Sequence, residues 1–320
     1  MKLRVLYHGN CFDGSASAGL FARFFRENLA KGAGEVAYTP MQHKGDAQPI
    51  ESKLLDGDVN ACVDFRYSQD PHLGWWFDHH VSAFQLAGDE AHFRADKSGQ
   101  KFYDPHRKSC TKFLAETLAE RFGWDISRFS ELLHWAEIID GALFPSAAMA
   151  VELREPALRL MTWVENNRER PLAERFIEDL VSRPLADIAT DDYVAESLAP
   201  LLVRHEENVT AMRRLSHVDQ GVAVSDLIPE GISTINKFIV YYLHPDARYA
   251  VTLLETKERY RISVGSNPWP KTPRTHDIAK LCEKYGGGGH PAVGAISLPK
   301  TDPAAVQKVA GEVISFLQNG

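Results

Sequence analysis

The sequence contains little cysteine: its four cysteines, Cys11, Cys62, Cys110 and Cys282, are scattered along 320 residues. None lies at short spacing from another, which argues against a disulfide framework and against a cysteine-based zinc site. Long apolar runs are also missing, because no stretch approaches the roughly 18 residues that a membrane span requires. The first residues lack the apolar core of a signal peptide. We therefore expect a cytoplasmic protein that does not enter the membrane.

An excess of positive charge is missing as well. The 36 lysines and arginines are outnumbered by 43 aspartates and glutamates, so the net charge is −7. A surface that coats long DNA is therefore not expected, although a local basic cleft for a short phosphate-bearing ligand is compatible with this charge. At 320 residues with 44% hydrophobic residues, the chain is long enough for two domains with buried cores.

The first 80 residues contain four short apolar runs, at 3–7, 35–41, 59–63 and 75–77. A helical pattern to about residue 30 and a short one at 48–55 alternate with them, which predicts a parallel α/β sheet. Three of the runs end in side chains that bind metals: His8, Asp64 and Asp78-His79-His80. Asp-His-His alone is also explained as a polar loop. Because the carboxyl ends of parallel strands meet at one edge of a sheet, the three ends together predict a ligand site.

The middle of the chain is mainly helical. Residues 83–107 are polar and are expected to form a loop or a hairpin. Ser109 is a good N-cap for a helix that Gly123 closes, and a second helix over 127–139 ends at Asp140. An aspartate at a helix C-terminus opposes the helix dipole, so either a nearby cation or an exposed turn is needed there. Helical sequence continues to about residue 180.

A long helical stripe over 191–217 is expected to link two domains, 1–190 and 218–320. His205 in this stripe is interpreted as a packed histidine rather than a ligand. The second domain is predicted to be a smaller α/β domain. Its expected elements are a strand at 221–226, a helix at 233–243, a hairpin of 249–255 with 260–264, a short helix at 277–285, a strand at 292–298 and a closing helix at 301–317.

Four consecutive glycines, 286–289, follow the short helix and precede His290. One glycine is sufficient to end a helix, and four cost backbone entropy. Such a run lets backbone N–H groups turn toward an anion, but no Lys-Ser or Lys-Thr follows, so it is not a P-loop. Phosphate or nucleotide binding and a structural hinge are the two interpretations. Nearby, Trp269, Lys271 and Arg274 can supply stacking and charge, or belong to a surface loop.

Five motifs follow one another along the chain: His8-Gly9-Asn10-Cys11-Phe12-Asp13-Gly14, Val63-Asp64-Phe65-Arg66-Tyr67, Asp78-His79-His80, Asp140 and Gly287-Gly288-Gly289-His290. In this order they resemble the motifs of the DHH-family phosphoesterases over nearly the whole chain. The last motif is similar to that of the DHH-associated C-terminal domain in the RecJ and oligoribonuclease branch. The resemblance implies an N-terminal parallel-sheet DHH domain, joined by the helical linker to a substrate-binding domain.

The resemblance also implies roles for single residues. Asp64 would be a bridging metal ligand, His80 would face the scissile phosphate, and Asp78 would orient its neighbours. The implied ions are one or two Mn²⁺, with Mg²⁺ as the alternative. The other implied metal ligands are His8, Asp13, His79 and Asp140. The residues assigned to substrate binding are Asn10, Gly287, Gly288, Gly289 and His290.

One departure from the family pattern concerns the metal count. Many members have two aspartates in the first motif, whereas this chain has the amide Asn10 and the single acid Asp13. The leading hypothesis is a Mn²⁺-dependent phosphodiesterase that cleaves short oligonucleotides or nucleotide-derived esters in an interdomain cleft. The alternatives are a nucleoside bisphosphate phosphomonoesterase and a nucleotide-binding regulator with a degenerate metal site. A pyrophosphatase is disfavoured by the glycine motif, and the oligomeric state is left open.

Overall fold

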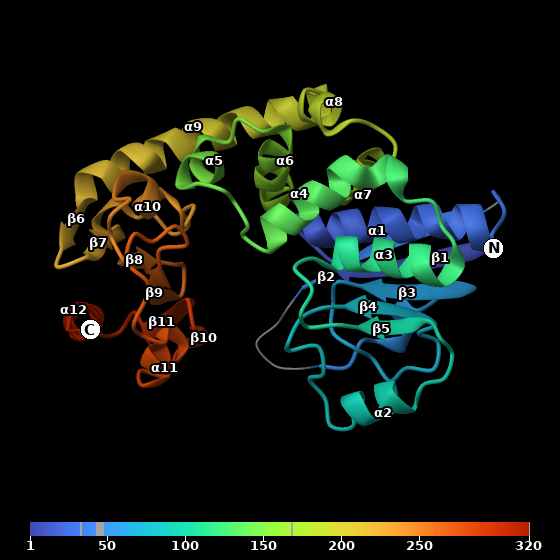
Figure 1. Cartoon of the computed structure of the whole chain (residues 1–320), viewed down its shortest axis with the longest axis horizontal. Coiled ribbons are helices and arrows are strands. Elements are labelled where there is room, and N and C mark those ends of the chain that lie inside the picture. Colours follow the sequence, from blue (N-terminus) through green and yellow to red (C-terminus); the bar gives the residue numbers. More distant parts are fainter. Residues whose placement is uncertain (33, 43–47, 168, 320) are drawn as a thin grey trace. The chain divides into compact units, whose positions relative to one another are not determined.

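The computed structural model describes residues 1–32, 34–42, 48–167 and 169–319. The chain divides into two compact units, and Figure 1 shows their elements coloured along the sequence. The first unit comprises Met1–Phe144 and Arg154–Leu198, and the second comprises Pro145–Leu153 and Ala199–Gly320. The boundary at residues 198 and 199 lies inside one long helix, α9 (Asp192–Leu215). A helix is therefore present where the sequence predicted one. Within the described residues, no helix is both long enough and apolar enough to cross a membrane.

The first unit contains a five-stranded sheet in the order β2-β1-β3-β4-β5, and every neighbouring pair is parallel. This confirms the predicted parallel α/β sheet. The four strands predicted from apolar runs are present with nearly the predicted bounds. They are β1 (Lys2–His8), β2 (Glu35–Met41), β3 (Val59–Val63) and β4 (Trp75–Asp78).

Strand β4 is buried on both faces, as its apolar run predicted. Trp76 contacts Phe93 with ring centroids 5.3 Å apart, and Phe77 contacts Phe21 with centroids 6.0 Å apart. Phe93 belongs to α2 (Asp89–Ala95) and Phe21 to α1 (Phe12–Phe24). Because successive side chains of a strand point to opposite faces, different helices cover the two faces of the sheet.

The loop or hairpin predicted over 83–107 is wrong. This segment contains helix α2 and a fifth strand, β5 (Lys101–Tyr103), which pairs parallel to β4. All three residues of β5 are only partly buried, so the segment lacks the continuous apolar run of a central strand. Asp89 supports α2, since its Oδ2 accepts hydrogen bonds from the backbone of Gln85 and Leu86.

Helices of the first unit surround α1, which continues as a π-helical turn, Phe25–Leu29. Gly19 allows one close contact, because a Cβ there would lie 2.7 Å from the carbonyl oxygen of Ile177 in α7 (Arg170–Leu180). The short helix predicted at 48–55 is reduced to one 3₁₀ turn, Ser52–Leu54. A second 3₁₀ turn, Ser127–Phe129, precedes α4 (Ser130–Asp140). The remaining helices are α3 (Cys110–Phe122), α4 (Ser130–Asp140), α6 (Pro156–Asn166), α7 (Arg170–Leu180) and α8 (Leu185–Ala189).

The second unit contains a six-stranded mixed sheet in the order β10-β11-β9-β8-β7-β6. Among the described strands of this sheet, only β7 and β8 are parallel neighbours, and β8 with β9 forms the predicted hairpin. The strands are β6 (Ser216–Asp219), β7 (Val222–Asp226), β8 (Tyr249–Glu255), β9 (Arg259–Ser266), β10 (Gly288–His290) and β11 (Val293–Pro299). The helices are α5 (Ala147–Glu152), the 3₁₀ turn Ile228–Glu230, α10 (Ile239–Leu243), α11 (Ile278–Glu283) and α12 (Pro303–Gln318).

The helix predicted over 233–243 begins only at Ile239, so the prediction is wrong for residues 233–238. Asn236 explains the difference, because its Oδ1 accepts a hydrogen bond from Phe238 N and its Nδ2 donates to the carbonyl of Ala150. Asparagine side chains that bond the backbone in this way compete with helix formation. The pattern of apolar residues alone did not reveal this turn.

Candidate metal centre

The polar residues predicted at three strand ends lie together. His8 ends β1, Asp64 follows β3, and Asp78 ends β4, and these strands are neighbours in the sheet. Asp64 is at the centre: its Oδ2 lies 3.4 Å from His8 Nδ1, and its Oδ1 lies 3.5 Å from His79 Nε2 and 3.8 Å from His80 Nδ1. The expectation that the three strand ends converge is therefore confirmed.

Two further carboxylates approach His79 from helices. Its Nε2 lies 3.3 Å from Asp140 Oδ2, at the end of α4, and 3.9 Å from Asp13 Oδ2, in the first turn of α1. A protonated or metal-bound imidazole beside Asp140 offsets the unfavourable helix-dipole interaction noted from the sequence. All five residues predicted as metal ligands are thus in one cluster.

Asp13 is held by the start of α3. Its Oδ2 accepts a hydrogen bond from Cys110 N at 2.7 Å, and its Oδ1 accepts one from Thr111 N at 3.0 Å. These amides belong to the first turn of the helix, where N–H groups lack partners within the helix and attract anions. The predicted N-cap Ser109 is confirmed, since its side chain accepts from Lys112 N. The sequence predicted the start of α3, but it did not predict that this start would bind the carboxylate of Asp13.

The two histidines are oriented by different acceptors. His79 Nδ1 lies 3.0 Å from the carbonyl oxygen of Arg107, and donation to that oxygen directs Nε2 toward the carboxylates. Asp78 Oδ1 lies 2.7 Å from His80 Nδ1 and also accepts the backbone N–H groups of His79 and His80. Asp78 is fully buried. The arrangement supports the expected orienting function of Asp78.

The donor atoms form two overlapping groups that suit a divalent metal. His8, Asp64 and His80 form one group and Asp13, Asp64 and His79 the other, with the donor atoms of each group within 4.8 Å of one another. Both carboxylate oxygens of Asp64 and Nε2 of His79 are buried and have no hydrogen-bond partner in the described part of the chain. Carboxylate oxygens and imidazole nitrogens are ligands of Mn²⁺ and related ions. The residues therefore fit a metal centre in which Asp64 belongs to both groups.

Burial and crowding of the carboxylates shift their pKa values. Burial raises the pKa of Asp13 well above its ordinary value, and the charges of Asp64 and Asp140 raise it further. Burial, together with Asp64, raises the pKa of Asp140 to about 6. Burial also acts upward on the pKa of Asp64, but contacts with His79 and His8 outweigh it and hold that pKa below its usual range. A bound cation would relieve the repulsion among these three acids.

The pKa values of His79 and His80 are raised, although burial alone would lower them. Burial lowers the pKa of His79, but Asp64 and Asp13 outweigh this effect and raise it to about 10. Burial likewise lowers the pKa of His80, and Asp78 outweighs it to give a value of about 9. The imidazole positions are thus favourable for positive charge. A metal ion bound at the neutral imidazoles would take the place of these protons.

Asn10 makes hydrogen bonds within the protein. It adopts a left-handed backbone conformation with φ of 56°. Its Nδ2 donates to the carbonyl oxygens of Val164 and Asn167 at the end of α6, and its Oδ1 accepts from Gln42 Nε2. These hydrogen bonds account for an amide side chain at position 10, and no bound ligand is needed to explain it. Its assignment to substrate binding stays a prediction.

The glycine run is partly explained by the fold. Gly288–His290 forms edge strand β10, paired antiparallel with β11, rather than an open loop. The N–H groups of Gly286 and Gly287 bond to the end of α11, and a Cβ on Gly287 or Gly289 would lie 2.2 Å from a carbonyl oxygen of β11. A Cβ on Gly288 would have open space. Gly286 has a φ of 73°, a conformation that favours glycine. Gly288 is therefore the one of the four whose lack of a side chain is not explained by the described residues.

Sequence reasoning missed Cys11, which lies beside the cluster at the N-cap of α1. Burial raises the pKa of its thiol well above the ordinary value, and the charges of Asp64, Asp140 and Asp13 add to this. The sequence could have pointed to Cys11, because it lies in the first motif, two residues before Asp13. His205, interpreted as a packed histidine, lies outside the cluster, and its Nε2 is 2.7 Å from the carbonyl oxygen of Val151.

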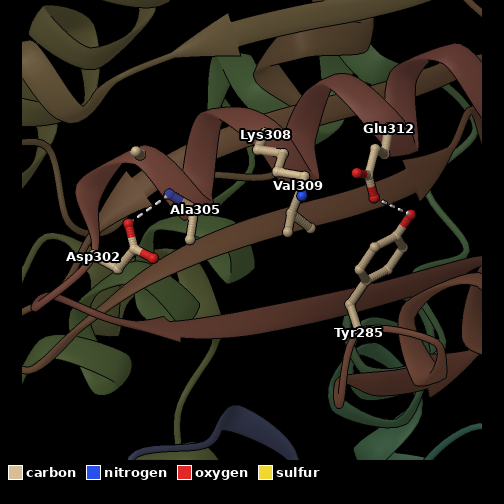
Figure 2. A pocket seen from close by; sticks show the side chains of 7 residues that line it. Tyr285, Asp302, Ala305, Lys308, Val309 and Glu312 are labelled. Atoms are coloured by element: carbon tan, nitrogen blue, oxygen red, sulfur yellow. Dashed lines mark hydrogen bonds between the residues drawn. The ribbon is translucent and has the colours of Figure 1, made fainter.

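A hollow of about 480 Å³ lies along α12 in the second unit and contains none of the predicted site residues. Figure 2 shows Tyr285, whose hydroxyl donates to Glu312, and Asp302, which accepts from Ala305 N. These polar groups are engaged with one another or with the helix start. The hollow therefore adds no residue to the metal centre.

No protein-family model matches the chain, and no curated protein matches it. Several solved structures match the chain. The pGpG-specific phosphodiesterase PggH from Vibrio cholerae has a TM-score of 0.68 and 19% identity, over 98% of this chain and 99% of that chain. The DHH domain of a protein described as a member of a family of ribosomal proteins has a TM-score of 0.60 and 12% identity, covering 98% and 86% of the two chains.

A third similar structure is RecJ from Thermus thermophilus in complex with Mn²⁺. It has a TM-score of 0.52 and 16% identity, over 98% of this chain and 52% of that longer chain. At these identities the likeness concerns the fold, and it extends over both units. The five motifs in the sequence had led to the same expectation for the fold. The chain therefore has the fold of these proteins, one of which is a DHH domain.

Proposed function

We propose that the protein is a Mn²⁺-dependent phosphodiesterase that hydrolyses short oligonucleotides or nucleotide-derived phosphoesters. The observation that carries this proposal is the position of Asp64. Its two oxygens are buried, lack hydrogen-bond partners among the described residues, and belong to two donor groups at once. A carboxylate shared in this way is the arrangement expected when two metal ions lie side by side.

The chain's residues have distinct functions in the proposed centre. His8, Asp13, Asp64, His79 and Asp140 would hold the metal, and His80, which also belongs to one donor group, would contact the scissile phosphate. When bound, divalent ions supply an activated water and stabilise charge on the phosphoryl and leaving oxygens. Mg²⁺ is the alternative ion.

The residues around the donors position them. Asp78 holds the His80 ring through its 2.7 Å contact with Nδ1, so that Nε2 is the nitrogen proposed to contact the phosphate. The start of α3 orients both oxygens of Asp13. The side chains of His8, His80 and Asp140 are 25%, 31% and 27% exposed, whereas that of Asp64 is 1% exposed. Substrate would therefore reach the centre from the side of His8, His80 and Asp140.

A short substrate is favoured by two observations. The net charge of −7 does not suit a long polyanion, and the similar structure PggH, which matches nearly the whole length of this chain, is a pGpG-specific phosphodiesterase. We propose that Gly288 and His290 contribute to substrate binding. Gly288 has the open space that a close-lying ligand needs, and His290 is exposed.

The test is hydrolysis by the full chain in Mn²⁺. The substrates are pGpG, a five-nucleotide RNA, a five-nucleotide DNA and a nucleoside 3′,5′-bisphosphate, with products separated by chromatography. We expect pGpG to yield mononucleotides and Asp64→Asn to lose activity by at least a hundredfold. Asp187→Asn is the matched control, because Asp187 is exposed on α8.

Each alternative has its own outcome in this experiment. Release of inorganic phosphate from the bisphosphate without cleavage of any diester would contradict the phosphodiesterase and indicate a phosphomonoesterase. Binding of nucleotides without hydrolysis of any substrate would indicate a regulator with a degenerate centre. Equal activity of Asp64→Asn and the parent would refute the metal-centre assignment.

A further inference from the structure

A second hollow, of about 310 Å³, lies within the second unit and has mainly aromatic and proline walls. Its volume is at the lower end of the roughly 300–1,000 Å³ typical of small-molecule sites. It is formed by the start of α5, helix α10 and the loop after β9. Helices α5 and α10, which are labelled in Figure 1, pack against each other. The lining residues are Pro145, Ser146, Ala147, Ala148, Tyr241, Tyr242, Pro245, Asn267 and Trp269.

Hydrogen bonds and ring contacts hold these walls in place. The buried Asn267 donates from Nδ2 to the carbonyls of Pro245 and Ala247, and its Oδ1 accepts from Trp269 N. The Trp269 ring packs on Phe238 with centroids 5.6 Å apart. Tyr242 donates its hydroxyl to Glu152 Oε1. A pocket whose side chains are already ordered loses little entropy when a ligand binds.

The lining restricts the chemistry of an occupant. None of the nine lining residues is charged, so a phosphate or carboxylate would lose its hydration there without a counter-ion. Flat rings are favoured instead, because the partly exposed Trp269 and Tyr242 offer aromatic surfaces on which a heteroaromatic ring can stack. The uncharged, planar part of a nucleotide meets both conditions.

One hydroxyl group of the lining, that of Ser146, provides a polar contact for such a ring, whereas that of Tyr241 is buried within the wall. Tyr241 is 5% exposed, and its hydroxyl has no hydrogen-bond partner among the described residues. A buried hydroxyl without a partner is unfavourable, and Gly265 leaves room for it, since a Cβ there would lie 2.8 Å from the hydroxyl oxygen. Ser146 accepts from Met149 N and retains its own proton for donation.

We propose that this hollow, named here the aromatic pocket, binds a nucleobase. The inference rests on the proposed function for the choice of a nucleotide as ligand. It adds a site to that function, because none of the residues of the aromatic pocket belongs to the five motifs. Ala148 provides a position where a larger side chain would fill the pocket without removing a wall.

The test is calorimetric titration of the full chain with guanosine 5′-monophosphate and with ribose 5-phosphate, both in EDTA. We expect the nucleotide to bind at least tenfold more tightly than the sugar phosphate, the size of effect that base stacking gives. Trp269→Ala and Ala148→Trp should each weaken nucleotide binding about tenfold and leave sugar-phosphate binding unchanged. Trp269→Phe should retain most of the affinity.

Tyr285→Ala is the matched control, because it removes an aromatic side chain from the other hollow of the same unit. It should bind the nucleotide like the parent. Equal affinity of the parent for nucleotide and sugar phosphate, or unchanged nucleotide binding in both Ala148→Trp and Trp269→Ala, would overturn the inference. The titration contains no metal and involves no cleavage, so a failure of hydrolysis contradicts the proposed function and leaves this result independent.

Discussion

His80 Nδ1 lies 2.7 Å from Asp78 Oδ1, within hydrogen-bond distance. The same carboxylate oxygen accepts the backbone N–H groups of His79 and His80. One buried aspartate therefore fixes both the backbone turn after β4 and the ring of His80. This relationship leads to the first prediction.

Asp78→Asn should lower kcat/KM by roughly 10–100-fold, the usual effect of losing a residue that orients a ligand. The amide keeps the volume of the side chain but removes the charge that attracts the His80 ring. Steady-state kinetics in Mn²⁺ and the thermal midpoint would be measured beside Asp187→Asn. A parent-like rate for Asp78→Asn would show that the orientation of His80 is unimportant for catalysis.

Mn²⁺ should raise the thermal midpoint of the parent by roughly 5–10 °C when free metal is a hundredfold above its dissociation constant. The reason is that burial, together with the charges of the neighbouring aspartates, raises the pKa values of Asp13 and Asp140, and a bound cation offsets both effects. Asp64→Asn should lose most of this increase, which differential scanning calorimetry would detect. Elemental analysis of the loaded protein would count the ions. An equal increase in parent and variant would place the stabilising metal elsewhere.

Asn10→Asp should destabilise the first unit by about 1–3 kcal/mol and should not increase the metal count. A carboxylate at this position would face the carbonyl oxygens of Val164 and Asn167, to which the amide now donates. Urea unfolding and elemental analysis measure the two effects. A gain of one bound ion would mean that position 10 can reach the metal centre.

Gly287→Ala and Gly288→Ala should differ sharply, although the residues are adjacent. A Cβ on Gly287 would lie 2.2 Å from the carbonyl oxygen of Ala295, so this variant should unfold at lower urea concentration. Gly288→Ala has open space, should keep the parent's stability, and should raise KM if a ligand lies against this strand. Unfolding and kinetics on both variants test this. An unchanged KM in stably folded Gly288→Ala would remove Gly288 from the proposed binding site.

Glu178 should contribute to stability in a pH-dependent way. Burial raises its pKa, but hydrogen bonds from Arg26 and Tyr38 outweigh this and lower the pKa below the ordinary 4.5. A lowered acid pKa stabilises the folded state above the unfolded pKa, and this stabilisation is lost as the pH falls through the folded pKa. The difference in unfolding free energy between the parent and Glu178→Gln should be largest near pH 7 and shrink below about pH 4. A constant difference would contradict this linkage.

Local patterns were sufficient for elements whose residues are buried or capped within their own segment. Strand β4 is a run of apolar residues, β1 and β3 are mostly buried, and Ser109 and Gly123 mark the two ends of α3. Strand β5 was missed because Lys101–Tyr103 is only partly buried and is defined by pairing with β4. Strand β10 was missed at the glycine run for a similar reason, since its pairing with β11 determines it.

The sequence by itself determined the parallel sheet and the convergence of His8, Asp64 and Asp78 at one edge, because parallel strands place their carboxyl ends together. Only the tertiary structure showed how donors are oriented and shared. Asp13 depends on amides of Cys110 and Thr111, about a hundred residues away, and Asn10 on carbonyls at the end of α6. Such contacts join segments with no local relationship, so no spacing or periodicity in the chain encodes them.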